Sequence, residues 1–327
     1  MTVDGAFPPA VTPNSGKHAT KEQLPKQLYT TIDKFALESG EVLTNVTVAF
    51  TVKGRLNAQR TNAVVICHAL SGRGSMGGMV ALEWAILGKH FVRSMVLVAT
   101  AGRQSPWAIA WAENQRATIK SDSKFRGGCY GDDPPRDGLA AARMAAMISY
   151  RTHSSFEKRF GRKRLETYAA PNVMLPKANG TRPPFAIDVQ RAKRDDGHYD
   201  KSGIFLAQSY LRYQGEKFNA RFDANCYLHI LDKIDSHDIA RDRYLNLSDD
   251  EAMRKVLGQI QQRTLVVGVP TDGLYPLPEQ IAVFQGLSNA TFATIQSDDG
   301  HDGFLLEGEQ LNELLRSFFG SDPDLKT

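Results

Sequence analysis

The stretch GSMGGMVALEWAILGKHFVRSMVLVAT, residues 74–100, contains the two signals that decide the fold. Apolar residues recur at helical spacing over 76–87, and 92–100 is a short, β-branched apolar run typical of a buried strand. Upstream, NAVVICHA at 62–69 indicates a second buried strand. Strand, turn, helix and strand in this order predict an α/β protein with a mostly parallel, doubly wound sheet.

Ser75 stands at the start of the predicted helix, after Gly74 and before the pair Gly77 and Gly78. A serine on a tight strand-to-helix turn is exposed as a nucleophile, and glycines are needed there because a side chain would collide with the neighbouring strand and helix. The backbone N–H of Met76, at the helix N-terminus, is then placed to stabilise an oxyanion. An ordinary Gly/Ser turn that caps a helix has the same pattern, so the motif alone leaves both interpretations open.

Two later residues complete the pattern of a catalytic triad. Asp272 follows the apolar run TLVVGVP at 264–270, and His301 follows TFATIQ at 291–296. Both runs predict parallel strands, and open α/β sheets place their sites at the carboxyl ends of such strands. In this arrangement His301 takes the proton of Ser75, and Asp272 fixes the imidazole tautomer and stabilises its charged form. Each residue alone would more often be a loop acid or a surface histidine, but the order serine, acid, histidine favours the catalytic interpretation.

The rest of the chain divides into a sheet domain and a helical insertion. The sheet domain is predicted over 26–103 and 264–320, with a β-meander at its start and an amphipathic helix at its end. The intervening 104–263 has apolar residues at helical intervals and no strand-like run, which predicts a helical lid. Within it, the polar region 167–203 contains prolines and glycines and predicts a mobile loop. Residues 1–25 predict a flexible tail.

Composition and charge narrow the class of protein. The chain has 327 residues, of which 42% are hydrophobic and 23% charged, as in soluble globular proteins. Its net charge of +4 is spread along the chain, so neither nucleic acid nor a membrane is expected as a partner. Cys67, Cys129 and Cys226 form no C-x-x-C pair, which argues against disulfides and against a metal site. The expected location is cytoplasmic, with an organellar transit peptide in the acid-poor 1–25 as the alternative.

Segments over nearly the whole chain, from about residue 34 to 319, resemble those of one enzyme family. They are similar to signature stretches of the homoserine O-acetyltransferase family, its fungal members in particular: GSMGGMVALEW (74–84), ATAGRQSPWAIAWAENQR (99–116), GLAAARM (138–144), SYRTHSSFEKRFGR (149–162), SYLRYQGEKFNARFDANCY (209–227), DSHDIARDR (235–243), TDGLYP (271–276) and GHDGF (300–304). The resemblance implies an α/β-hydrolase fold and a ping-pong reaction. Ser75 would take acetyl from acetyl-CoA, a co-substrate, and pass it to the hydroxyl of L-homoserine in methionine biosynthesis. It implies no cofactor, small molecules as partners, and a homodimer formed through the helical insertion.

The same resemblance implies which residues hold the amino-acid acceptor and the oxyanion. Arg221 and Tyr227, in ARFDANCY, match the positions expected to bind the substrate carboxylate, which a guanidinium can clamp with two hydrogen bonds. Asp302 matches the acid expected near the substrate ammonium. The backbone N–H of Leu70 matches the second oxyanion donor, beside that of Met76. Without the resemblance, the same residues suggest a surface ion pair at Arg221, a core aromatic at Tyr227 and a solvated loop acid at Asp302.

The chain departs from the family just before the serine. In the family a much longer stretch separates the HAL segment from the nucleophile, and even one strand–helix–strand unit takes about 30 residues. Here only 71–74 lie between Leu70 and Ser75, and Arg73 stands where the turn normally has glycine. We therefore expect an internal deletion after Gly72 that removes central strands and leaves a gap in the sheet. If the strand at 62–69 instead shifts into the gap, the donor from Leu70 is lost and turnover falls by roughly 10²–10³.

Three other functions stay open on the sequence alone. The acceptor could be serine or a deacetylcephalosporin-type precursor, because the family contains such specialisations. The same triad could hydrolyse its acyl-enzyme and act as an esterase. A non-catalytic or truncated family member is the third possibility, and the shortened connection before the serine favours it.

Overall fold

The computed structural model of the chain describes the following stretches: 28–37, 40–52, 57, 63–67, 76–164 and 204–321. The predicted tail at 1–25 and the predicted mobile loop at 167–203 lie outside these residues. The chain divides into two compact units, Met1–Val64 and Val65–Thr327.

The described part of the first unit is an antiparallel hairpin. Strand β1 (Leu28–Ala36) pairs with β2 (Val42–Phe50) in a register that runs from Leu28 opposite Phe50 to Ala36 opposite Val42. Both strands are rich in β-branched residues, as expected of exposed pleated strands. The β-rich start that the sequence predicted is therefore a hairpin whose first strand begins earlier than its apolar pattern suggested.

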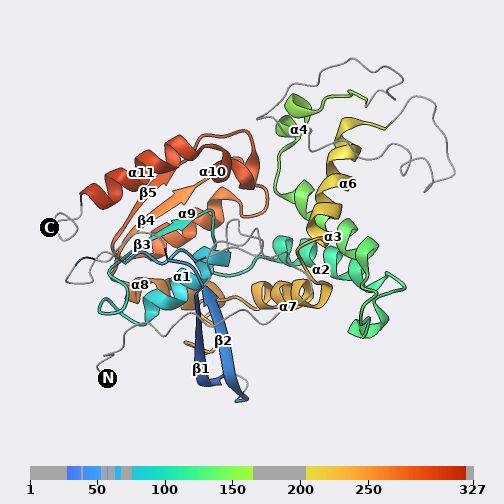
Figure 1. Cartoon of the computed structure of the whole chain (residues 1–327). Coiled ribbons are helices and arrows are strands. Elements are labelled where there is room, and N and C mark those ends of the chain that lie inside the picture. The colour runs from blue at the N-terminus through green and yellow to red at the C-terminus, as the bar shows by residue number, and fades with distance from the viewer. Residues whose placement is uncertain are drawn as a thin grey trace. The chain divides into compact units, whose positions relative to one another are not determined.

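The second unit contains a parallel sheet with the order β3-β4-β5. The strands are β3 (Ser94–Val98), β4 (Arg263–Gly268) and β5 (Ala290–Thr294), and they appear side by side in Figure 1. β3 lies within its predicted run at 92–100, and β4 and β5 each begin one residue before theirs and end two residues earlier. Because β4 and β5 are neighbours with parallel directions, the loops after them, which carry Asp272 and His301, leave the same edge of the sheet.

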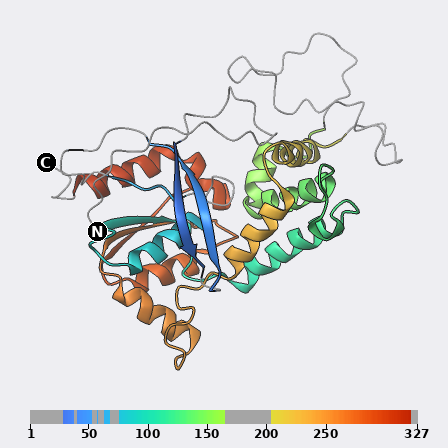
Figure 2. The same cartoon turned by 60° about the horizontal axis from the view of Figure 1, so that its bottom comes forward.

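Helices cover both faces of this sheet (Figures 1 and 2). On one face, Leu97 and Val266 pack with helices α1 (Met76–Ile86), α8 (Asp249–Gln259) and α9 (Leu277–Gly286). On the other face, Leu265 and Val267 pack with α10 (Gly303–Leu306) and α11 (Gly308–Gly320). This two-sided burial explains why the strands are continuous apolar runs and not alternating ones.

The helical insertion has its own core. Its helices are α2 (Pro106–Lys120), α3 (Arg136–Ser149), α4 (His153–Arg159), α6 (Leu206–Asn219) and α7 (Ala224–Asp235), with a short 3₁₀ turn η1 (Arg126–Gly128) after α2. Side-chain caps start several of them: Ser105 accepts from Ala108 N before α2, and Asp223 accepts from Cys226 N before α7. No helix within the described stretches is long and apolar enough to cross a membrane.

The predicted strand at 62–69 is wrong where the structure describes it. Residues 63–67 form no strand, and Val64, Val65 and Ile66 are 70%, 64% and 75% exposed. Among the described strands, β3 has β4 as its one neighbour, so its other edge carries no strand pairing. Short apolar runs acquire strand structure only when a neighbour pairs with them, and here no described strand lies beside this run.

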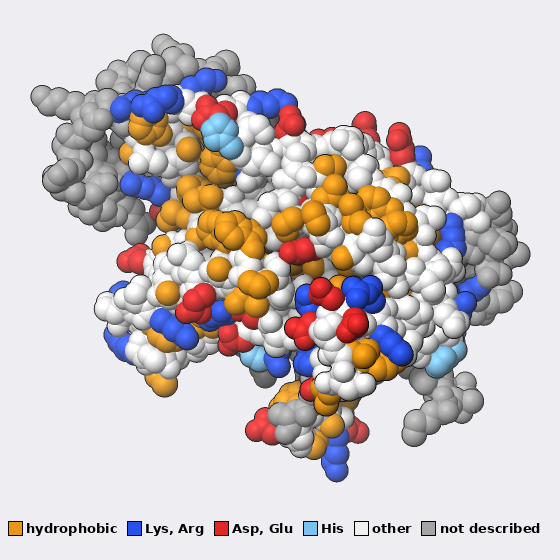
Figure 3. Space-filling view, turned by 180° about the vertical axis from the view of Figure 1, so that it is seen from behind, with side chains coloured by type: hydrophobic (Ala, Val, Ile, Leu, Met, Phe, Trp, Pro, Cys, Tyr) orange, Lys and Arg blue, Asp and Glu red, His pale blue; other side chains and the backbone are white. Residues whose placement is uncertain are grey.

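Helix α1 is apolar apart from Glu83, which pairs with Arg243, and it is buried on one side. Leu82 and Ala85 are buried against the sheet, whereas Trp84 is 39% exposed and packs edge-on against the exposed Phe91, with ring centres 5.5 Å apart. Val80 and Leu87 are also exposed. Helices that are apolar on all sides are normally buried on all sides. The space-filling view shows hydrophobic side chains gathered in broad patches on one face of the molecule (Figure 3).

Candidate active site

Asp272 lies in a tightly bonded turn at the carboxyl end of β4. Its Oδ1 accepts the backbone N–H groups of Leu274 and Tyr275, both at 2.9 Å, and the side chain is buried. Gln280, on α9, is fully buried: its Oε1 accepts from Val269 N at 3.1 Å and its Nε2 donates to the Tyr275 carbonyl at 2.6 Å. Hydrogen bonds from Gln280 and Asp272 therefore hold the turn from Val269 to Tyr275. Oδ1 of Asp272 is used in these bonds, and its Oδ2 is left for another partner.

His301 meets that free oxygen. It lies in the 3₁₀ turn η2 (Gly300–Asp302) after β5, and its Nδ1 is 2.7 Å from Asp272 Oδ2. The ring is 4% exposed and packs among Tyr150, Tyr275 and Phe304. Because Nδ1 faces a carboxylate, the neutral imidazole carries its proton there and Nε2 is the nitrogen that can accept another. This is the geometry of an acid–histidine pair that acts as a general base.

The charge around the imidazole raises its pKa. Burial alone would lower the pKa of His301, but the Asp272 carboxylate, by charge and hydrogen bond, and the Asp302 carboxylate outweigh burial. These two acids and the rings of Tyr150 and Tyr275 are the titratable groups that face it. A raised pKa means that the imidazolium formed during proton transfer is stabilised.

We expect acylation of Ser75 by a serine-directed probe to increase with pH, with a midpoint above the ordinary histidine value of 6.5. Only the neutral imidazole can take a proton, so the rate must fall as pH drops through the raised pKa. Labelling rates between about pH 5 and 9 would measure the midpoint. Asp302→Asn should lower it, because one of the two raising charges is removed. A midpoint below 6.5 would show that burial dominates.

The nucleophile and one oxyanion donor, Ser75 and Leu70, lie outside the described residues. Met76, which directly follows the serine, is the first residue of α1 and lines the same pocket as His301. The glycines after it are sterically required. A Cβ on Gly77 would lie 2.0 Å from the Cys67 carbonyl oxygen, and one on Gly78 would lie 2.7 Å from the Thr100 side chain. The start of α1 therefore packs as closely as the sequence predicted.

The pocket beside His301 lies between the sheet edge and the helical insertion. Helices α2 and α7 supply its mostly apolar walls, and amide and hydroxyl groups are interspersed among them. The lining comprises Met76, Gln104, Ala108, Trp111, Ala112, Gln115, Ser149, Tyr150, Leu231, Ile234, Leu274, Tyr275, His301 and Asp302. Apolar walls with a few convergent polar groups are typical of small-molecule sites.

Of the predicted acceptor-binding residues, one lines this pocket. Asp302 is 2% exposed, so it is not a solvated loop acid, and its Oδ2 pairs with Arg151 Nε at 3.1 Å. Tyr227 is fully buried and donates its hydroxyl hydrogen bond to Gln115, which does line the pocket. Arg221 is exposed at the end of α6, and among the described residues the pocket lining includes neither Arg221 nor Tyr227.

A residue that the sequence did not single out, Arg143, has the stronger geometry for binding an anion. It is 1% exposed on α3, and its guanidinium lies over the rings of Tyr150 and Phe218, 5.6 and 5.0 Å from their centres. Within the described chain its Nε and Nη1 have no hydrogen-bond partner. Buried donors without partners are costly. Arg143 is not among the residues that line the pocket, but Tyr150, which lies under its guanidinium, is one of them. Nothing in the sequence indicated that Arg143 is buried, because a charged residue among apolar residues at helical spacing normally faces solvent.

Comparison with known proteins matches these observations. Residues 74–308 match the family model of the alpha/beta hydrolase fold. The chain is 36% identical to a homoserine O-acetyltransferase of Gibberella moniliformis, covering 93% of this chain and 83% of the relative, and 33% identical to one of Emericella nidulans, covering 88% and 85%.

Solved structures share the fold. A homoserine O-acetyltransferase from Bacillus anthracis aligns with a TM-score of 0.71 at 16% identity, over 90% of this chain and 97% of that one. Esterase E22 aligns with a TM-score of 0.67 at 16% identity, over 90% of this chain and 99% of that one. At such identities the likeness concerns the fold alone, and it does not distinguish transfer from hydrolysis.

The alignment with the Gibberella relative is also longer than the part of this chain that it covers. It runs over 394 positions, whereas 93% of this 327-residue chain is about 304 residues. About 90 positions of that alignment therefore have no counterpart in this chain.

Proposed function

Because the chain belongs to the homoserine O-acetyltransferase family, we propose that it moves an acetyl group from acetyl-CoA, through Ser75, to the side-chain hydroxyl of L-homoserine. The observation that carries the proposal is the Asp272–His301 pair, 2.7 Å apart, at a pocket that Met76 also lines. In the sequence Met76 directly follows Ser75. An imidazole that can accept a proton and a serine at a helix start are the two parts that acyl transfer needs.

The reaction has two halves with balanced proton transfers. In the first, His301 Nε2 takes the proton of Ser75, whose oxygen attacks the thioester carbonyl. The C–S bond then breaks, the thiol leaves with that proton, and an acetyl ester remains on the serine. In the second, His301 takes the proton of the acceptor hydroxyl, whose oxygen attacks the ester. The serine leaves and recovers the proton. Asp272 stabilises the imidazolium in both halves.

The buried charges support an amino acid as the acceptor. A zwitterion needs a cation for its carboxylate and an anion for its ammonium. Arg143 has two buried donors without partners in the described chain, and its guanidinium lies over the ring of Tyr150, which lines the pocket. Asp302 presents a buried carboxylate in the pocket wall. We propose that Arg143, in place of Arg221, binds the acceptor carboxylate, since an exposed guanidinium is hydrated and gives little selectivity.

Two arginine variants test this assignment. Arg143→Met should raise the KM for the amino-acid acceptor by roughly 10- to 100-fold, because it removes a charge-assisted hydrogen-bond pair. The KM for acetyl-CoA should stay within a few-fold. Arg221→Met is the matched control and should leave both KM values nearly unchanged. Steady-state kinetics of both variants decide between the two positions, and the reverse pattern would restore the original assignment.

We further propose that turnover in this chain is low because a segment before Ser75 is missing. Three observations support this: 63–67 form no strand, β3 has no described neighbour on one edge, and the outer side of α1 is apolar and exposed. The unmatched positions in the alignment with the Gibberella relative agree with them. A turn that lacks its preceding strand cannot hold the nucleophile and oxyanion donors in register.

Release of free thiol from acetyl-CoA tests the proposed function. Thiol release that requires L-homoserine supports it, and a larger response to L-serine or to a deacetylcephalosporin would reassign the acceptor. Release at the same rate without any acceptor would indicate an esterase-type hydrolysis. Failure of Ser75 to react with a serine-directed acyl probe would contradict the catalytic role of the triad. Turnover of about 1–10³ per second, the usual range of enzymes, would contradict the proposed impairment.

A further inference from the structure

The loop that carries His301 is unusually acidic. Asp298, Asp299 and Asp302 fall within five residues, and two of them lie two positions before and one position after the histidine. Like charges this close repel each other, most strongly where they are buried. In the described part of the chain, Arg151 is the cation that forms ion pairs with this loop.

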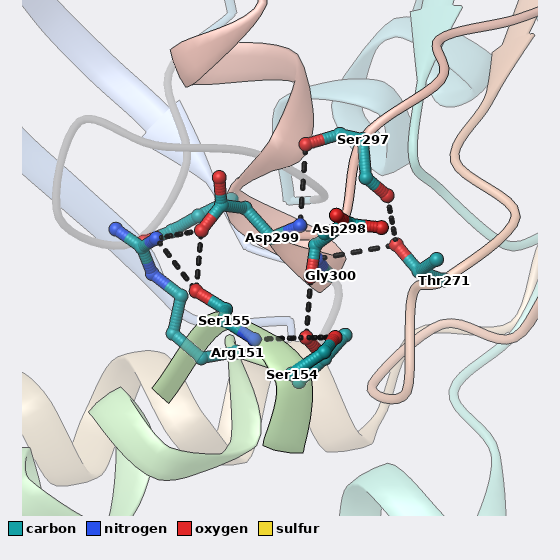
Figure 4. A network of polar contacts seen from close by, with 10 residues as sticks. Arg151, Ser154, Ser155, Thr271, Ser297, Asp298, Asp299 and Gly300 are labelled. Atoms are coloured by element: carbon teal, nitrogen blue, oxygen red, sulfur yellow. Dashed lines mark hydrogen bonds and ion pairs between the residues drawn. The ribbon is translucent and has the colours of Figure 1, made fainter. Parts of the chain in front are cut away.

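Arg151 reaches the loop from the helical insertion. It lies in the turn between α3 and α4, and its guanidinium binds both flanking carboxylates: Nη1 is 2.5 Å from Asp299 Oδ1, and Nε is 3.1 Å from Asp302 Oδ2. Figure 4 shows the pair to Asp299 with its surrounding bonds. The side chains of Arg151 and Asp302 are 7% and 3% exposed, so their pairing is shielded from water and salt.

The backbone around Arg151 fits the same loop. Thr152 donates its hydroxyl hydrogen bond to the Asp298 carbonyl, and Asp302 N donates to the Tyr150 carbonyl at 3.2 Å. Gly300 has φ +66°, and a Cβ there would lie 3.0 Å from the same Tyr150 carbonyl. The turn after α3 and the loop before His301 are therefore in direct contact, and a shift of one would move the other.

We propose that Arg151 is a positioning residue that joins the carboxylates on either side of His301 and thereby holds the imidazole against Asp272. The inference rests on the role of His301 as the general base in the proposed function. Without the guanidinium, Asp302 would be a buried carboxylate with no cation beside it, and this would strongly destabilise the present conformation of the loop. The loop relieves this by moving toward solvent, and His301 moves with it.

Three variants of the full chain test the proposal, and Arg116→Met serves as a matched control. They are Arg151→Met, Arg151→Lys and the double variant Arg151→Met/Asp302→Asn. Arg116 also holds a shielded ion pair in the insertion, with Asp235 at 2.6 Å and a side chain 12% exposed, but it does not line the pocket. One readout is the far-downfield proton resonance of the His301–Asp272 hydrogen bond, assigned by its loss in Asp272→Asn. The other is the rate of Ser75 labelling by an acyl probe.

Arg151→Met should lose the downfield resonance and label Ser75 roughly 10- to 100-fold more slowly, as expected of a misplaced base. The labelling rate of Arg151→Lys should lie between that of Arg151→Met and that of the unmodified chain. The double variant should label faster than Arg151→Met, because removing both partners of a buried pair costs less than removing one. Arg116→Met should lower the melting temperature and leave both readouts unchanged.

Two results would overturn the inference: Arg151→Met with an unchanged resonance and labelling rate, or an Arg116→Met variant that loses as much as Arg151→Met. If Arg151→Met does not fold, Arg151→Lys decides, since unchanged labelling there also overturns the inference. Failure of the proposed function would be distinct. In that case the unmodified chain shows no labelling of Ser75, while the resonance is present and still depends on Arg151.

Discussion

Inserting the segment that we propose is missing should raise turnover by roughly 10²-fold or more, the scale set by a single oxyanion donor. The segment that precedes the nucleophile in the Gibberella moniliformis relative would be placed between Ser71 and Ser75. We expect it to pair with the open edge of β3 and to cover the exposed side of α1, where Trp84 is 39% exposed. The turn before Ser75 would then have a strand on which to form, and the donor from Leu70 would regain its own position.

Thiol release from acetyl-CoA with L-homoserine measures this gain. The same insertion combined with Ser75→Ala should show no gain, which ties the activity to the nucleophile. A Gly/Ser linker of equal length is the matched control, because it lengthens the connection without supplying strands. If the linker restores turnover as well as the native segment does, chain length and not sheet structure limits the reaction. Burial of the α1 face can be followed independently by reduced binding of a dye that reports exposed apolar surface.

Asp272→Asn should slow acylation of Ser75 by about 10⁴-fold, as loss of the acid does in other serine triads. The turn should survive, because an asparagine side-chain oxygen can still accept the N–H groups of Leu274 and Tyr275, now 2.9 Å from Asp272 Oδ1. The amide nitrogen then faces His301 Nδ1, and the imidazole is forced into the tautomer that cannot serve as base. Charge stabilisation of the imidazolium is lost at the same time.

Glu279→Gln is the matched control for this variant. Glu279 is half-buried, and burial together with the nearby Asp272 charge raises the pKa of its carboxyl. It does not contact the imidazole, so the substitution should change acylation by no more than a few-fold. The rate of Ser75 labelling, taken at a pH above the midpoint of its pH dependence, compares Asp272→Asn with Glu279→Gln. Equal losses in the two would mean that general electrostatics near α9, and not the bond to His301, supports the reaction.

The sequence predicted the parts of the fold that depend on local pattern. Buried parallel strands are short apolar runs between turns, so β4 and β5 were found, and with them the positions of Asp272 and His301 at the sheet edge. The same criterion was wrong for 63–67, the described part of the predicted strand at 62–69. A strand also needs a neighbour that pairs with it, and the run itself does not show that no described strand does so.

The proposed acceptor site depends on tertiary contacts that the spacing of residues in the sequence does not encode. Arg143 lies on α3 and Arg221 in the turn between α6 and α7, and packing distinguishes the buried arginine from the exposed one. Tyr227, which the resemblance placed at the substrate, is instead a buried core residue whose hydroxyl donates a hydrogen bond to Gln115. The sequence did not single out Arg151, because its partners Asp302 and Asp299 lie 151 and 148 residues away in the chain. Arg151 reaches these partners because the turn after α3 packs against the loop that carries His301.

The uncovered side of α1 also bears on the fate of the polypeptide in a cell. Bare apolar helix surface and an unpaired strand edge are the features that chaperones and proteases recognise in incompletely folded chains. The described residues of this chain show both features, so we expect it to be degraded faster than its longer relatives and its steady-state abundance to be low. Selection would then act on this gene through the amount of protein that survives as much as through the chemistry at the serine.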